Sequence, residues 1–416
     1  MKDRTILHCD LNNFFASVEC TLNPALADEF VAVCGNKEHR HGIVLAKNQN
    51  AKNAGVKTGE TIAEAQKKCA NLVVVSPHYE EYVNYAKKVQ NIYKQYTDKV
   101  ESFGLDECWL DVTESLKLFG DGKKIADELR EKVKQSTGLT ISVGVSFCKV
   151  FAKLGSDLKK PDATTVIDKD NYKSVVWGLP ATDMLMVGRQ TQKKLTKYNI
   201  RTIGDLAKAD EKMLKYVFGV NGVKIKNCAA GNDDSPVSYC DVALPVKSVG
   251  HSTTTVVDIC EYQTAKQVLW FLSDMVAMRL RKYGLKANGV SVSIRYNNLD
   301  FAGKQAKIPL PSFDGNEIAQ KAFELLKELW RGQTDTPLRL LGVSTFDLIP
   351  VSADVQENLF DTPKRDKADT LSFTVDKIRK KYGYNSVKKA VTLNNDVMTD
   401  KSPIEDTDFL PFKKLS

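Results

Sequence analysis

Three acidic residues, at two places far apart in the sequence, could together bind divalent metal ions. Asp10 lies near the end of one apolar segment, and the adjacent pair Asp106 and Glu107 lies between two others. Carboxylate oxygens are the ligands that Mg²⁺ prefers, and two such ions catalyse phosphoryl transfer by activating the attacking hydroxyl and neutralising phosphate charge. Because three carboxylates in one site repel one another, their clustering would require a cation.

An ordinary hairpin turn is the plainer interpretation of the acidic pair, since acidic residues are common in turns. The pair by itself favours that interpretation. Apolar residues flank it, however, at 103–105 and 108–112. Carboxylates in such surroundings would be costly to bury without a counter-ion, so the context favours a metal site.

The predicted order of strands and helices explains how the carboxylates could meet. Apolar periodicity predicts, in chain order, a strand over 5–11, a long helix over 79–96, strands over 100–104 and 108–112, a helix around 125–133 and a strand over 141–146. This β-α-β-β-α-β order is typical of a ferredoxin-like sheet, which has helices on one face and leaves the other available for a site. It makes the strand that carries Asp10 a neighbour of the acidic pair. The fold alone does not define the reaction.

The rest of the chain predicts further domains, and hence a multi-domain α+β protein. Residues 25–77 resemble an insertion of short strands and helices, and residues 167–234 predict a helical region with glycine-centred turns. Residues 243–350 alternate between strands and helices as a second α+β unit. Residues 351–416 are polar and charged, with one helix over 372–382.

Composition argues against several classes of protein. No stretch of the 416 residues approaches the roughly 18 apolar residues of a membrane span, and the N-terminus does not resemble a signal peptide, so we expect a cytoplasmic protein without membrane partners. The nine cysteines include no CxxC pair, which argues against a zinc knuckle and a disulfide framework. A net charge of +8 fits a polyanionic partner, and equally an ordinary solvated surface.

Three segments resemble the palm motifs of the Y family of DNA polymerases, most closely its DinB/UmuC branch. They are HCDLNNFFASVE from residue 8, FGLDECWLDVT from residue 103 and SVGVSFCKVFAKLGSDLKKPDA from residue 142. The resemblance extends over residues 1 to about 350 and implies template-directed, error-prone DNA synthesis past lesions. The domains it implies are a palm at 1–24 and 78–166, fingers at 25–77, a helix-hairpin-helix thumb at 167–234, a little finger at 243–350 and a tail at 351–416.

For the acidic residues, the resemblance implies a catalytic metal site. Asp10, Asp106 and Glu107, together with the backbone carbonyl of Leu11, would bind two Mg²⁺ ions, with Mn²⁺ as a substitute. The ions would serve the transfer of a nucleotide from a dNTP to the primer strand of primer-template DNA.

Five other residues would surround the dNTP. Phe15 matches the steric-gate ring, which leaves no room for a 2′-hydroxyl, whereas the neighbouring Phe14 could equally be a core residue. Lys160 matches the lysine that contacts the triphosphate, for which a compact cation is suited. The fingers depart from the family, because Gln49 and Lys52 stand where tyrosine and arginine are usual. Lys52 can replace the charge of arginine but not its two-pronged hydrogen bonding.

Residues beyond the palm are expected to contact the DNA backbone. They are Gly188, Lys193, Gly219, Lys247 and His251. The two glycines belong to turns that resemble helix-hairpin-helix motifs, which bind phosphates through N–H groups at a helix N-terminus. Met186 occupies a position in the first turn where glycine is usual, so plain helical packing is the alternative there. Lys247 and His251 lie in a segment that resembles the strand beside the template, and His251 is as readily a surface residue.

Gln356, Leu359 and Phe360 form a QxxLF peptide of the kind that docks on a sliding clamp. Leu359 and Phe360 would be the apolar anchors and Gln356 a polar one. The alternative is a chance apolar pair in a linker.

Two other functions remain open. A catalytically silent member of the family could bind DNA and the clamp as a scaffold, although the presence of all three acids counts against this. A nucleotide cyclase on the same palm topology would have a GGDEF-like hairpin, and the segment FGLDE lacks its double glycine. The helix-hairpin-helix turns would also be superfluous in a cyclase.

Overall fold

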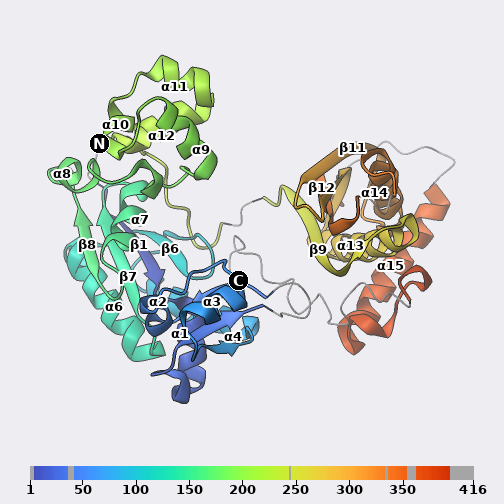
Figure 1. Ribbon diagram of the computed structural model, residues 1–416, viewed down its shortest axis with the longest axis horizontal. Coiled ribbons are helices and arrows are strands. Elements are labelled where there is room, and N and C mark those ends of the chain that lie inside the picture. The colour runs from blue at the N-terminus through green and yellow to red at the C-terminus, as the bar shows by residue number, and fades with distance from the viewer. Residues whose placement is uncertain (1–3, 36–41, 243–244, 333–335, 354–361, 394–416) are drawn as a thin grey trace. The chain divides into compact units, whose positions relative to one another are not determined.

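The computed structural model describes residues 4–35, 42–242, 245–332, 336–353 and 362–393, excluding the side chains of 362–366. The described residues divide into two compact units, the first formed mainly by residues 4–34 and 44–242 and the second mainly by the described residues from 245 to 393. Figure 1 labels most of their helices and strands.

The first unit is built on a five-stranded sheet with the order β5-β6-β1-β7-β8. Its strands are β1 (Ile6–Leu11), β5 (Val100–Ser102), β6 (Glu107–Asp111), β7 (Ile141–Ser146) and β8 (Thr164–Ile167). β1 pairs antiparallel with both β6 and β7, which confirms the predicted ferredoxin-like order. β8 is parallel to β7 and extends the predicted sheet by one strand. Glu107 is the first residue of β6, not part of the turn before it.

Helices pack on both faces of this sheet. α4 (Tyr79–Tyr93) and α6 (Gly122–Thr137) bury their apolar residues against one face, together with Leu7, Cys9 and Leu110. α7 (Lys149–Leu158), which the apolar periodicity did not predict, packs against β1 and β7, where His8 contacts it. The open face expected of a ferredoxin-like sheet is therefore covered along these strands, and all six residues of β1 are buried.

Gly144 on β7 allows α7 to approach so closely. A Cβ atom at this position would lie 1.9 Å from the carbonyl oxygen of Ala152 on α7. A side chain of any size would therefore push the helix away from the sheet, and glycine is required for the packing rather than for its backbone freedom.

An insertion follows α1 (Phe14–Leu22), as predicted. It contains a three-stranded sheet of order β3-β2-β4 and two helices. The elements are β2 (Val31–Cys34), β3 (Val44–Lys47), α2 (Gln49–Asn53), α3 (Ile62–Lys68) and β4 (Val73–Val75), the last of which extends the predicted set.

The predicted helical region follows the first sheet. It consists of α8 (Tyr172–Val176), α9 (Arg189–Lys197), α10 (Ile203–Lys208), α11 (Glu211–Phe218) and α12 (Val220–Ala229). Its apolar core is shared with α7, which contributes Phe151 and Leu154. α7 thus joins the helical region to the five-stranded sheet.

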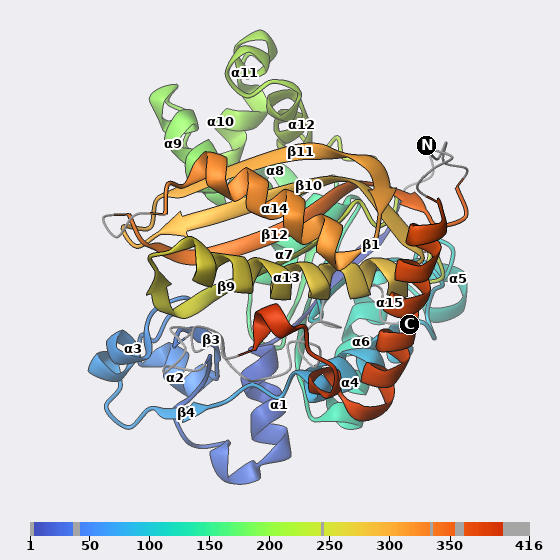
Figure 2. The same cartoon turned by 90° about the vertical axis from the view of Figure 1, so that its right-hand side faces the viewer.

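The second unit is the predicted second α+β domain. Its antiparallel sheet has the order β11-β10-β12-β9. The elements are β9 (Ser248–Ile259), α13 (Tyr262–Lys282), β10 (Leu285–Tyr296), β11 (Phe301–Ser312), α14 (Gly315–Leu329) and β12 (Leu338–Pro350). Both helices lie across one face of the sheet, side by side (Figure 2).

The predicted polar tail is partly built into this second unit. Its helix, α15 (Thr362–Tyr382), begins ten residues earlier than the predicted start at residue 372. The Arg281 guanidinium of α13 donates hydrogen bonds of 2.6 and 2.9 Å to the two carboxylate oxygens of Asp376. Arg379 lies 2.8 Å from the buried Asp274, so two ion pairs anchor α15 on α13.

Candidate active site

The sheet brings the three predicted carboxylates to the same end of β1 and β6. Asp10 is the cross-strand partner of Glu107, and the N–H of Leu11 donates a 2.9 Å hydrogen bond to the carbonyl oxygen of Asp106. Nearly a hundred residues of sequence separate the two segments, and strand pairing alone closes that gap.

Burial makes negative charge costly at this place. Burial is the largest cause that raises the pKa of Asp10 to about 7, and the nearby Glu107 and Asp106 act in the same direction, against Lys160. Burial and Glu107 likewise raise the pKa of Asp106. Glu107 differs: burial opposes its ionisation, but hydrogen bonding to His8 and the charge of Lys153 lower its pKa to about 2.

Two lysines neutralise part of the negative charge. The Lys160 ammonium lies 2.8 Å from Asp10 Oδ1 and 2.8 Å from Asp157 Oδ1. Lys153 on α7 lies 2.5 Å from Glu107 Oε2. Lys153 and Asp157 were not predicted, although their i, i+4 spacing places both on one side of α7, and Lys160 follows in the loop after that helix.

His8 is a third residue that the sequence analysis missed. It is fully buried on β1, with Nδ1 2.8 Å from the Ser156 hydroxyl and Nε2 3.3 Å from Glu107 Oε2. Burial lowers the pKa of His8 to about 4. The imidazole is therefore neutral at pH 7 and lies between Ser156 of α7 and the Glu107 carboxylate. An alternating strand with a polar residue two positions before Asp10 is the signal that could have identified it.

The carboxylates fit a divalent cation chemically. As the side chains stand, no group of three or more His, Cys, Asp or Glu residues in the described ranges is arranged to hold a metal, and Asp10 and Glu107 pair with lysines instead. The donors are nevertheless hard oxygens, and in the described part of the chain two lysines, Lys153 and Lys160, pair with this group of one buried and two partly buried acids. Burial raises the pKa values of Asp10 and Asp106, and the positive charge of a divalent cation would offset that cost of ionisation.

The two phenylalanines after β1 occupy different environments. Phe14 is 3% exposed and belongs to the core of the first unit. Phe15 is only partly buried, and its ring stacks on Tyr82 with centroids 4.2 Å apart and an interplanar angle of 10°. The Tyr82 hydroxyl donates a 2.5 Å hydrogen bond to Glu19, which His78 also contacts. The Phe15 ring therefore rests on a fixed support.

The two predicted fingers residues differ in their contacts. Gln49 on α2 accepts a 3.5 Å hydrogen bond from the Asn13 amide, next to the phenylalanine pair. Lys52, one turn further along α2, is exposed. Gln49 is thus connected to the end of β1.

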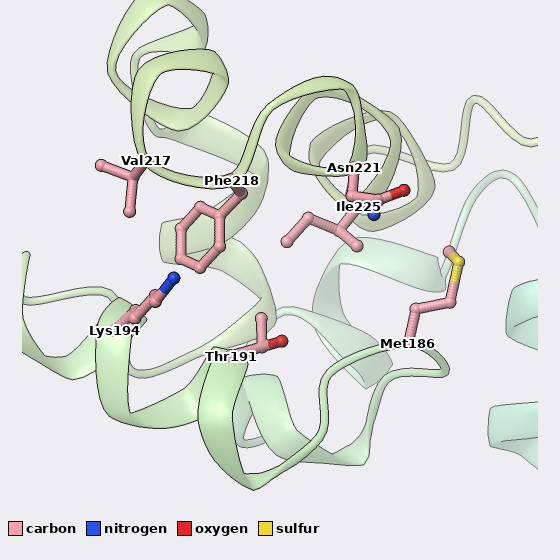
Figure 3. Close-up of a pocket in the computed structure, with 7 residues that line it drawn as sticks. All are labelled: Met186, Thr191, Lys194, Val217, Phe218, Asn221 and Ile225. Carbon is pink, nitrogen blue, oxygen red and sulfur yellow. The ribbon is translucent and has the colours of Figure 1, made fainter. Parts of the chain in front are cut away.

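Both predicted hairpin turns contain a residue with left-handed backbone. Met186 has φ 72° and Gly219 has φ 64°. Met186 therefore adopts the conformation for which glycine is usual, and the turn forms despite the substitution. Gly188 and Gly219 directly precede α9 and α12, and the Lys193 side chain on α9 is exposed. A pocket of about 340 Å³ lies between the turns, with Met186, Lys194 and Asn221 among its lining residues (Figure 3).

Gly219→Ala is expected to destabilise the helical region by about 1–3 kcal/mol, because φ 64° with ψ −149° is essentially restricted to glycine. Gly188→Ala is the matched control, since its φ of −80° suits any residue. A Cβ atom meets nothing within 4 Å at either position, so only the backbone differs. Chemical denaturation of both variants measures the effect, and equal stabilities would contradict this account of the turn.

The two predicted contacts in the second unit also differ. Lys247 is exposed just before β9. His251 lies on β9, where burial and the neighbouring Arg279 lower its pKa to about 4. At pH 7 the His251 ring is neutral, so it can offer a phosphate a hydrogen bond but no charge. Residues 356–360, the predicted clamp peptide, lie outside the described residues.

The sheet brings Asp10 together with the Asp106–Glu107 pair where β1 meets β6, as expected of the palm of a polymerase. The family model described as impB/mucB/samB matches residues 9–157, and the model of its C-terminal domain matches residues 246–359. DNA polymerase IV of Acetivibrio thermocellus is 47% identical over 94% of this chain and 98% of its own length. DNA polymerase IV 1 of Bacillus subtilis is 33% identical over 100% of this chain and 99% of its own. The chain belongs to the Y family of DNA polymerases, in its DinB-like branch.

A solved Y-family DNA polymerase chimera has the same fold, with a TM-score of 0.74 and 22% identity, and covers 83% of this chain and 99% of its own. The protein is thus a DNA-directed DNA polymerase of the translesion type, as the three motifs predicted. Family membership implies dependence on divalent metal ions and binding of DNA and dNTPs. Nothing in these relationships favours the silent scaffold. Among the described residues, no helix is long and apolar enough to cross a membrane.

Proposed function

We propose that Asp10, Asp106 and Glu107, with the backbone carbonyl of Leu11, hold two Mg²⁺ ions for error-prone synthesis on damaged template. Such ions, when bound, favour loss of the proton from the primer 3′-hydroxyl and neutralise triphosphate charge. The observation that carries the proposal is the pairing of Asp10 with Glu107 across β1 and β6. Mn²⁺ has the same preference for oxygen ligands and would substitute.

Lys160 is the residue we assign to the incoming triphosphate. Its ammonium already lies 2.8 Å from Asp10, so it is held beside the carboxylates before a nucleotide arrives. A compact, flexible cation suits the changing charge of the phosphates. Gln49 and Lys52 are the remaining candidates on the fingers side, the first through its position beside Asn13.

Phe15 is the residue we assign to sugar selection. The parallel stack on Tyr82 prevents the Phe15 ring from moving away in that direction. A 2′-hydroxyl placed against a fixed ring would clash, whereas a deoxyribose would fit. Phe14, buried in the core, supports the helix that carries the gate.

The order of helices and strands along the chain supports the domain assignments. We assign the palm to residues 1–24 and 78–166, the fingers to 25–77, the thumb to 167–234 and the little finger to 243–350. In the thumb, Gly188, Gly219 and Lys193 would bind the DNA backbone through helix N-termini and charge. In the little finger, Lys247 and His251 would lie beside the template backbone. We also propose that the enzyme is cytoplasmic and has no membrane partners.

Clamp docking through Gln356, Leu359 and Phe360 remains a proposal from the sequence. Because α15 is anchored on α13, substitution is a better test than deletion, which would shorten the connection from β12. Replacing Leu359 and Phe360 by alanine is expected to lower clamp-stimulated synthesis about tenfold or more, since apolar anchors carry most of such binding energy. Basal synthesis should not change, and Asn358→Ala is the matched control. Equal stimulation of both variants would dismiss the motif.

Primer extension with Mg²⁺ on an undamaged and a lesion-bearing template tests the proposed reaction. Extension of both templates, with misinsertion opposite the lesion or near it, is the expected result. Absence of extension on the undamaged template by folded protein that binds primer-template DNA would overturn the proposal in favour of a scaffold.

A further inference from the structure

The loop between α7 and β8 carries Lys160 and is fixed two residues later, at Asp162. The Arg130 side chain on α6 donates from Nε and Nη2 to Asp162 Oδ1, at 3.1 and 2.8 Å. Nη2 also donates to the backbone carbonyl of Asp162. One guanidinium thus holds both the side chain and the main chain of this residue.

Asn12, the residue directly after β1, binds the backbone N–H of Asp162. Asn12 Oδ1 accepts hydrogen bonds from the Asp162 N–H, at 2.8 Å, and from the Thr140 hydroxyl, at 3.0 Å. Asn12 Nδ2 donates to the Ser142 hydroxyl at 2.9 Å. Asn12 is 5% exposed, and these bonds use both its acceptor and its donor group.

Asp162 itself has a left-handed backbone, with φ 50°. A non-glycine residue adopts this conformation at a cost, and it persists where surrounding contacts determine it. Here Asn12 holds the N–H, Arg130 holds the carbonyl oxygen, and both Arg130 and Lys134 contact the carboxylate. The loop is therefore held in one conformation from two elements of the palm, α6 and the end of β1.

We infer that Arg130 and Asn12 are positioning residues that hold Lys160 at the triphosphate site by fixing Asp162. This inference rests on the proposed contact between Lys160 and the triphosphate. Arg130 is a partly exposed residue of α6, whereas the buried residues of this helix include Ile125, Ala126, Leu129 and Val133. Loss of the guanidinium therefore leaves the palm core intact and removes the attachment of the loop to Arg130, while Asn12 still holds the Asp162 N–H.

The decisive variant is Arg130→Gln, measured by steady-state dNTP incorporation into primer-template DNA. The KM for dNTP is expected to rise about tenfold with a smaller change in kcat, since a displaced Lys160 weakens ground-state binding. Arg130→Lys should recover little, because one ammonium cannot hold the side chain and the carbonyl together. Lys124→Gln is the control, an exposed residue of the same helix whose ion-pair partner is Glu128.

A double-mutant cycle separates positioning from general destabilisation. In a Lys160→Ala background, Arg130→Gln should add less than twofold to KM, because the two changes act through one contact. An equal multiplicative effect with and without Lys160, or an unchanged KM in the single variant, would overturn the inference. If Arg130→Gln fails to fold, Asp162→Asn serves instead, since asparagine tolerates the left-handed backbone and loses the ion pair.

The same cycle distinguishes this inference from the proposed function. An unchanged KM in Lys160→Ala alone would remove the triphosphate assignment, and the inference with it. A raised KM in Lys160→Ala, with no effect of Arg130→Gln, would remove only the positioning role.

Discussion

Replacing Asp106 by alanine is expected to reduce primer extension by about a thousandfold or more, which corresponds to about 4 kcal/mol of transition-state stabilisation. The Asp106 carboxylate is close enough to Asp10 to raise its pKa. The backbone carbonyl of Asp106 accepts a hydrogen bond from the Leu11 N–H. Removing one of three acids leaves too few oxygens to hold two ions. Single-turnover extension at saturating dNTP, with Mg²⁺ and then with Mn²⁺, measures the loss.

Stability provides an independent check on this variant. Burial raises the pKa of Asp106, so at neutral pH its ionised form is less favourable in the folded chain than in the unfolded chain. The Tm of Asp106→Ala should therefore equal or exceed that of the wild type. Glu114→Ala, at a side chain that is 76% exposed, is the matched acidic control and should retain extension. Wild-type activity in Asp106→Ala would end the metal-site assignment.

Replacing Phe15 by alanine is expected to raise ribonucleotide insertion, relative to deoxynucleotide insertion, by about a hundredfold. The Phe15 ring stacks on Tyr82, whose hydroxyl donates a hydrogen bond to the buried Glu19. In the wild type a 2′-hydroxyl would therefore clash with a ring that cannot move toward Tyr82. Alanine removes that surface and leaves space for the extra oxygen, and discrimination of this size is within reach of steric selection. The ratio of kcat/KM for CTP and dCTP opposite guanine measures the change.

Phe14 offers the contrasting variant for this experiment. Because Phe14 is 3% exposed within the palm core, Phe14→Leu should lower stability by about 1 kcal/mol and leave sugar selection as it was. Unchanged selection in Phe15→Ala, or an equal change in both variants, would remove the gate assignment. The two adjacent rings thus test whether position or aromatic character determines the choice of sugar.

Helices and strands were predicted correctly where apolar residues recur at regular spacing along a single element. The alternation in Ile141–Ser146 predicted a strand that the structure has with the same bounds, and the apolar spacing over 79–96 predicted the whole of α4, which ends three residues earlier, at Tyr93. The residues of α7 belong to the third palm motif, and the apolar spacing predicts no helix there. Short strands such as β4, with three residues, carry too little periodicity to be recognised.

The amino-acid sequence by itself determined the chemistry available to this polymerase: which residues are acidic, which are aromatic, and the order of strands that carries them. These features are local, because periodicity and motif spacing are properties of neighbouring residues. Only the tertiary structure decided that Lys153 pairs with Glu107, that Arg130 holds Asp162, and that α15 is fastened to α13. Each of these contacts joins residues tens of positions apart, and their energies depend on burial and distance, which exist only once the chain has folded.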